Sequence, residues 1–140
     1  MKGRVLAIDL GSKRVGVAVS DELRLTARPL RVIPRTPWKR LLKTLEELCR
    51  EFDVKTIVLG LPLGPEGVET EAASEARRVA GNLSLSLKIP VHLQDERLTS
   101  KAAEASLRRK GFQEKQVAAH VDGEAAAIIL SDFLSGPCGS

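Results

Sequence analysis

The order of apolar patterns along this chain predicts an α/β fold in which a mixed five-stranded sheet is flanked by helices. Three short β-branched runs lie near the N-terminus, and helical and strand patterns alternate after residue 36. Adjacent strands form an antiparallel meander, whereas a helix between two strands favours parallel pairing. A length of 140 residues suits one domain with one site. We expect the domain to span residues 1–135 and residues 136–140 to form a flexible tail.

The first two strands are expected at residues 5–8 and 15–19, which are rich in Val, Ile and Ala. Gly11-Ser12-Lys13-Arg14 joins them and predicts a short turn with its glycine at the tight position. A third strand is expected at residues 30–33, bounded by Pro29 and Pro34.

The first helix is expected over residues 37–52, with Thr36 as its N-cap and Pro37 at the first helical position. Its apolar residues recur at intervals of three and four, so one face packs on the core. The apolar run at 54–59 predicts a strand covered on both faces. The remaining patterns predict a helix over 69–87, a strand over 90–93, a helix from Thr99 or Ser100 to about Lys110, and a helix from Asp122 to Leu134.

Three carboxylates stand where they could form a site. Asp9 lies at the end of the apolar segment that opens the chain, where an unpaired carboxylate would be costly. It must therefore be solvated at the strand end, paired with a cation such as Arg14, or bound to a metal. Asp95-Glu96-Arg97 closes the last strand, and parallel strands would bring both sets of acids to one carboxyl edge. Asp122 precedes apolar positions of the last helix by four, seven and eleven residues, which places it on the stripe facing the sheet. Carboxylates this close repel unless a divalent cation neutralises them, and hard oxygen ligands suit Mg²⁺ or Mn²⁺.

Each residue also has a structural alternative. Asp122 could be an N-cap, Glu96 a surface acid paired with Arg97, and Asp9 a brace for the turn. His92 lies in mid-strand and is expected to pack rather than to bind a ligand. His120 is expected in a loop, where either simple exposure to solvent or a role in proton transfer is open.

Positive charge is concentrated near the N-terminus. Residues 1–40 carry ten Lys and Arg against three Asp and Glu, whereas the other hundred carry twelve against fifteen. These cations could bind the phosphate backbone of a nucleic acid, or they could form a solvated sheet edge that discourages aggregation. With 3% aromatic residues and no tyrosine, nucleic acid would be held by its phosphates rather than on an aromatic platform. The cations concerned are Lys13, Arg14, Arg24, Arg28, Arg31, Arg35, Lys39 and Arg40.

The two cysteines, Cys49 and Cys138, lack metal-binding spacing and suit a reducing compartment. No apolar run approaches the length of a membrane span, so we expect a cytoplasmic protein with no membrane partner.

Four blocks of sequence resemble the YqgF/RuvX family: DLGSKRVGVAVSD at 9–21, VLGLPL at 58–63, DERLTS at 95–100, and VD at 121–122 followed by AA at 125–126. The resemblance implies an RNase H-like fold and a metal-dependent nuclease site. Two activities are associated with the family, maturation of the 5′ end of 16S rRNA and resolution of Holliday junctions. Carried over to this sequence, the resemblance makes Asp9, Glu96 and Asp122 the catalytic, metal-binding acids. It places Arg14 and Arg97 beside them, either as phosphate contacts or as partners that orient the acids.

Two positions depart from the family pattern. Residues 113–120 read QEKQVAAH where the family is usually rich in Lys and Arg, and Gly64 stands where asparagine is common. Grip on the substrate near the last helix is therefore in question, whereas the acid set is intact.

We therefore predict a nuclease that hydrolyses phosphodiester bonds with two Mg²⁺ or Mn²⁺ ions, acting on precursor 16S rRNA. The alternatives are a resolvase of four-way DNA and a non-catalytic nucleic-acid-binding module that kept the acids. Asp9-x-Gly11 also opens actin-like ATPases, but those close two lobes over a nucleotide and this chain has room for one. We expect mainly a monomer, with a dimer possible. Its substrate contacts are expected to be Lys13, Arg14, Arg28, Arg31 and Arg97.

Overall fold

The computed structural model describes residues 3–95 and 114–136, with the side chains of 114–123 excepted. Its strands are β1 (Arg4–Leu10), β2 (Arg14–Ser20), β3 (Ala27–Pro34), β4 (Val54–Leu61) and β5 (Val91–Asp95). Its helices are α1 (Trp38–Glu51), the short 3₁₀ turn η1 (Pro65–Gly67), α2 (Glu71–Leu87) and α4 (Glu114–Ser135). The helix expected to begin at Thr99 or Ser100 lies outside the described residues.

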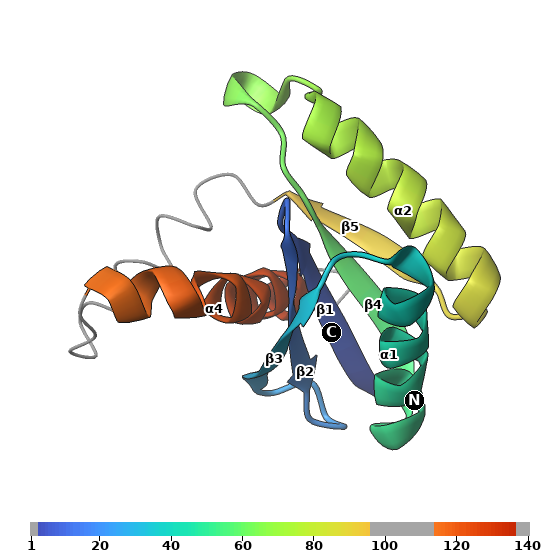
Figure 1. The fold of residues 1–140 in the computed structure, drawn as a ribbon. Coiled ribbons are helices and arrows are strands. Elements are labelled where there is room, and N and C mark those ends of the chain that lie inside the picture. Colours follow the sequence, from blue (N-terminus) through green and yellow to red (C-terminus); the bar gives the residue numbers. More distant parts are fainter. Residues whose placement is uncertain (1–2, 96–113, 137–140) are drawn as a thin grey trace.

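The strands form one mixed sheet in the order β3-β2-β1-β4-β5. The first three strands are an antiparallel meander, and β4 and β5 run parallel to β1. Helices α1 and α2 cover one face of the sheet and α4 covers the other (Figure 1). The predicted mixed five-stranded sheet flanked by helices is therefore confirmed.

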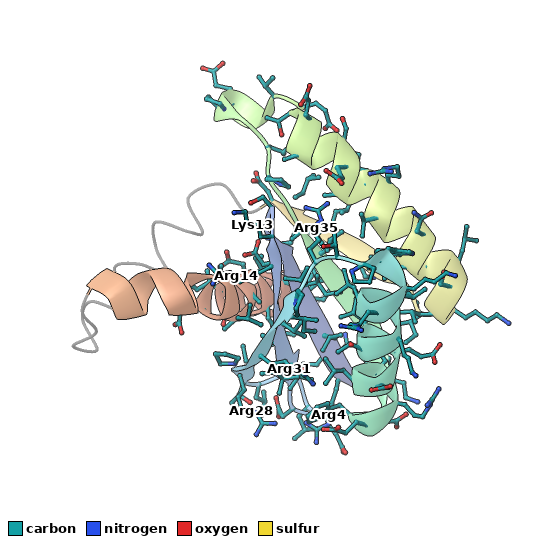
Figure 2. The ribbon with its side chains drawn as sticks, in the orientation of Figure 1. Arg4, Lys13, Arg14, Arg28, Arg31 and Arg35 are labelled. Atoms are coloured by element: carbon teal, nitrogen blue, oxygen red, sulfur yellow. The ribbon has the colours of Figure 1, made fainter. Side chains whose placement is uncertain are left out.

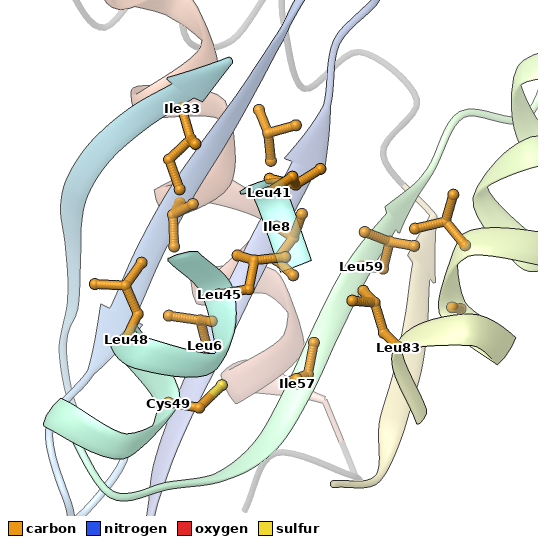
Figure 3. Packing of buried hydrophobic residues seen from close by; sticks show 14 of the residues in the cluster. Leu6, Ile8, Ile33, Leu41, Leu45, Leu48, Cys49, Ile57, Leu59 and Leu83 are labelled. Atoms are coloured by element: carbon orange, nitrogen blue, oxygen red, sulfur yellow. The ribbon is translucent and has the colours of Figure 1, made fainter. Parts of the chain in front are cut away.

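Two apolar cores lie on the two faces of the sheet. Alternation along β1 sends Leu6 and Ile8 toward α1 and α2, and Val5 and Ala7 toward α4. Asp9 follows Ala7 by two residues, so it belongs to the face that α4 covers. The first core includes Leu41, Leu45, Leu48, Ile57, Leu59 and Leu83 (Figure 3). The second core also includes Ala18, Val58, Ala126, Ala127, Ile129, Leu130 and Phe133.

The start of α1 differs from the expectation. Pro37 itself is the N-cap, with extended backbone angles, and no side chain caps the helix. The backbone N–H groups of Arg40 and Leu41 donate to the Pro37 carbonyl oxygen. Because the carbonyl of the N-cap residue accepts the first hydrogen bond of the helix, the N-cap is Pro37 rather than Thr36. The predicted Thr36 cap is thus wrong. In α2, by contrast, the Thr70 hydroxyl accepts a hydrogen bond from the backbone N–H of Ala73 at 3.0 Å.

Helix α4 begins at Glu114, eight residues before the expected start at Asp122. The intervening segment contains two alanines and no proline, so it favours continuation of the helix, and a single glycine at 123 does not end it. Asp122 is therefore not an N-cap, and His120 lies in a helix rather than in a loop.

Strand β3 is longer than expected: it begins at Ala27 and contains both Pro29 and Pro34, which were expected to bound it. A proline fits there because β3 is an edge strand with one unpaired side. Cys49 is buried, and burial, followed by the charge of Glu46, raises the pKa of its thiol to about 11. Cys49 thus lies on the buried apolar face of α1, and Cys138 lies outside the described residues. Within the described part of the chain, no helix is both long enough and apolar enough to cross a bilayer.

Candidate functional site

Asp9 is a buried carboxylate near the carboxyl end of β1, with 8% of its surface exposed. Its partner on β2 is Gly16. On β4, Gly60 follows Leu59, which pairs with Ile8, so Gly60 stands level with Asp9. Directly paired residues project to the same face, and neither glycine has a side chain to fill it. The sequence therefore leaves room beside the carboxylate on both neighbouring strands.

The turn between β1 and β2 brings two cations to the same end of the sheet. The backbone N–H of Gly11 donates to the Arg14 carbonyl oxygen at 2.8 Å and closes the turn. Residues 11–14 line a shallow hollow of about 360 Å³. Lys13 and Arg14 are both exposed there and lie at the carboxyl end of β1 (Figure 2). We call residues 11–14 the basic turn.

Arg35 holds the basic turn in place, a role that sequence reasoning missed. Its Nη1 donates to the Gly11 carbonyl oxygen at 2.8 Å, and its backbone N–H donates to the Lys13 carbonyl oxygen at 3.0 Å. Its Nη2 forms an ion pair with Glu75 Oε1 on α2 at 2.6 Å. The side chain of Arg35, which is 20% exposed, thereby links the Gly11 end of the basic turn to α2, while the Arg35 backbone holds Lys13. No local sequence pattern could have revealed this, because Glu75 is 40 residues away.

Arg28 and Arg31 lie on the α1 side of the sheet, opposite the face of Asp9. Arg28 pairs with Val19, and its guanidinium carbon lies 6.0 Å from the centroid of the Phe52 ring. Arg31 pairs with Val17, which belongs to the core beneath α1 and α2. Val19 pairs with Leu6, three residues before Asp9 and so about 10 Å away along the strand. The basic residues of the N-terminal segment therefore form two separate groups. Figure 2 shows Arg28 and Arg31 away from Lys13 and Arg14.

Strand β5 ends at the same edge of the sheet as β1, as expected, with β4 between them. Strands two places apart in a sheet are separated by about 10 Å. Asp95 pairs with Leu61, which belongs to the core on the α2 side. Glu96 and Arg97 lie outside the described residues, so their predicted roles stay predictions.

Asp122 lies in α4, the helix that covers the face of Asp9, but its side chain is outside the described residues. Among the described side chains, no three His, Cys, Asp or Glu residues come together as a metal site. The set of Asp9, Glu96 and Asp122 therefore stays a prediction. His92 is exposed, with its ring centroid 5.5 Å from that of Phe133, which is the packing role expected for it.

Comparison with known proteins decides the family. The sequence model of RuvX, described as Holliday junction resolvase, matches residues 3–136. The chain belongs to the RuvX family. A relative from Anaeromyxobacter sp. (strain Fw109-5), named "Putative pre-16S rRNA nuclease", is 41% identical over 133 residues, covering 95% of this chain and 97% of the relative. A relative of the same name from Syntrophomonas wolfei is 42% identical, covering 95% of this chain and 94% of its own length. The prediction of a nuclease is confirmed.

Solved structures place this RuvX-family chain in the RNase H-like fold. RuvC of T. thermophilus, solved with a Holliday junction substrate, has a TM-score of 0.57 at 17% identity and covers 95% of this chain and 94% of its own. The Holliday junction resolvase of fowlpox virus has a TM-score of 0.56 at 13% identity and covers 94% of this chain and 98% of its own. At these identities the likeness concerns the fold alone, and it confirms the predicted fold class.

Proposed function

We propose that this RuvX-family nuclease uses divalent cations to cut phosphodiester bonds of precursor 16S rRNA in the cytoplasm. The observation that carries the proposal is the position of Asp9. It is buried, flanked by glycine on both neighbouring strands, beside the basic turn, and on the face covered by the helix that contains Asp122.

The residues present fit a divalent cation. Asp9 offers hard oxygen atoms that Mg²⁺ and Mn²⁺ prefer, and the glycines leave room beside it. We assign Glu96 and Asp122 as the other ligands. Position 122 is four, seven and eleven residues before Ala126, Ile129 and Phe133, all of which pack toward the sheet. Asp95 belongs to the opposite face, which supports Glu96 as the ligand from this pair. When bound, two cations would supply an activated water and stabilise the leaving 3′ oxygen of an in-line displacement.

The side chains of the basic turn hold the phosphate of the substrate. Lys13 and Arg14 are exposed beside Asp9 and bring positive charge to the place where negative charge grows during cleavage. We assign Arg97 the same task. Because Arg35 fixes the carbonyl groups of Gly11 and Lys13, the turn is already arranged before substrate arrives.

Precursor rRNA is favoured over a four-way junction by the names of the relatives and by the number of sites needed. A junction is resolved by two near-symmetric cuts, which require two sites across a two-fold axis, whereas trimming an RNA end requires one. Among described residues the large exposed apolar side chains are Leu23, Leu25, Val68 and Leu85, which come from three separate segments. This scatter supports a protein that is mainly monomeric.

A panel of substrates tests the proposal. Precursor 16S leader, four-way junction, linear duplex and single strands are each incubated with Mg²⁺ or Mn²⁺, with light scattering on the same samples. We expect a monomer that cuts the leader. A stable dimer that makes paired cuts in the junction and leaves the leader intact would establish the resolvase instead. Binding without any metal-dependent cleavage would indicate the non-catalytic module.

A further inference from the structure

A second hollow, of about 310 Å³, lies between the start of α1 and the middle of α2. This volume is at the lower end of the range of about 300–1,000 Å³ found for small-ligand pockets. We call it the α1–α2 pocket. Its chemically informative lining residues are Leu10, Arg35, Trp38, Glu75, Arg78 and Asn82.

The lining suits a nucleotide. Trp38 is the only tryptophan of the chain, half-buried against the core, and offers an aromatic ring to the pocket. Arg78 is exposed and pairs with Glu75 at 3.1 Å, and Arg35 pairs with the same carboxylate. Two arginines thus share one carboxylate, which leaves one net positive charge beside the amide of Asn82. An aromatic ring, a cation and an amide are groups that recognise a base and its phosphate.

The α1–α2 pocket adjoins the candidate site across the edge of the sheet. Leu10 lines the pocket and directly follows Asp9, and their side chains lie on opposite faces. Arg35 lines the pocket as well and donates to Gly11 of the basic turn. A strand cut beside Asp9 would therefore reach this pocket by passing over the basic turn, where Lys13 and Arg14 are exposed.

We propose that the α1–α2 pocket binds one unpaired nucleotide of the substrate strand, with its base against Trp38 and its phosphate near Arg78. The inference rests on the proposed function, since it concerns how the same substrate is held. The pocket would make the nuclease prefer substrates with a single-stranded segment next to the cut, because a paired base cannot turn toward the Trp38 ring.

Tryptophan fluorescence tests the pocket without any cleavage. The probe is a single-stranded RNA of about ten nucleotides, a common site size, added in EDTA and compared with its duplex. We expect the single strand to quench Trp38 emission and the duplex to leave it unchanged. The anisotropy of the dye-labelled strand measures affinity independently. Trp38→Leu keeps an apolar side chain but loses the ring, so affinity should fall about tenfold, and Trp38→Phe should recover part of the loss.

Arg77 provides a matched control on the same helix. It pairs with Glu69 and does not line the pocket. Arg78→Gln should weaken RNA binding about three- to tenfold and reduce the slope of log K against log salt by about one, whereas Arg77→Gln should stay near wild type. Three results would each contradict the proposed binding of a nucleotide in the pocket. They are RNA binding with unchanged Trp38 emission, equal effects of Arg78→Gln and Arg77→Gln, and no binding of the single strand. Cleavage of the leader in the substrate panel is measured separately, so the pocket can fail while the nuclease assignment stands.

Discussion

Arg35 Nη2 lies 2.6 Å from Glu75 Oε1, while Nη1 of the same guanidinium donates to the Gly11 carbonyl oxygen at 2.8 Å. The ion pair therefore fixes the guanidinium that holds the basic turn. Glu75 is too far along the chain to be linked to the turn by local structure, so this contact connects α2 to the candidate site.

Glu75→Gln is expected to loosen the basic turn and weaken phosphate binding. Lys13 and Arg14 would hold the phosphate before cleavage and more strongly as negative charge grows on it, so KM should rise and kcat should fall, each by a few-fold. Loss of a partly buried charged hydrogen bond should also lower the free energy of unfolding by about 1 kcal/mol. Glu46→Gln is the control, because Glu46 forms an exposed pair with Arg50 on α1 and should cost only about 0.3–0.5 kcal/mol. Steady-state kinetics that are identical for the two variants would show that Glu75 has no positioning role.

Asp9→Asn, Glu96→Gln and Asp122→Asn should each abolish cleavage while the protein stays folded. The amide keeps the shape of the side chain but removes the charge that holds a cation. Without metal, stability should hold or rise, because repulsion among the carboxylates is relieved. Thermal unfolding with and without Mg²⁺ or Mn²⁺ gives a second readout, since only a protein that binds the ion is stabilised by it.

Asp132→Asn is the matched control for the acids, because Asp132 is an exposed carboxylate on α4. It should keep both cleavage and the stabilisation by metal. Undiminished cleavage by any one of the three acid variants would remove that residue from the site.

Substitution of Arg28 and Arg31 together by Gln tests whether the α1 side of the sheet contacts nucleic acid. If each binds one phosphate, affinity should fall for all sequences and the slope of log K against log salt should flatten by about one to two units. Base preference should not change. Arg50 and Arg77, substituted together, remove the same charge from exposed helix positions and serve as control. A slope equal to that of wild type would make Arg28 and Arg31 a solubilising face only.

The fold was predictable because α1 and α2 carry a helical apolar period and the strands are short runs rich in apolar residues, whereas contacts distant in sequence were not. Asp9 was identifiable because a charge stands inside an apolar strand. The face of Arg28 was not, because the register shifts between Val17 and Ala18, so that Arg28 and Arg31 share one face although they are three residues apart. The start of α4 was missed because Asp122 resembles a cap, although the residues before it favour a helix.

Asp21 should make stability depend on pH in the acid range. Its Oδ1 accepts hydrogen bonds from the backbone N–H groups of Leu25 at 2.7 Å and Thr26 at 2.8 Å, in the turn between β2 and β3. These bonds, that of Thr26 foremost, lower the pKa of the carboxyl below 3.8. The folded pKa is thus below the unfolded one, so the stabilisation is complete above about pH 4 and is lost as pH falls through the folded pKa.

Asp21→Asn removes this titration, so the stability difference between wild type and variant should shrink as pH falls below 4. Urea unfolding at several pH values measures that difference, and NMR titration of the Asp21 carboxyl gives its folded pKa directly. A folded pKa at or above 3.8, or a stability difference that stays constant with pH, would contradict the role of the Thr26 and Leu25 bonds. The turn lies at the end of the sheet opposite the basic turn, so cleavage at neutral pH should be unaffected by the substitution.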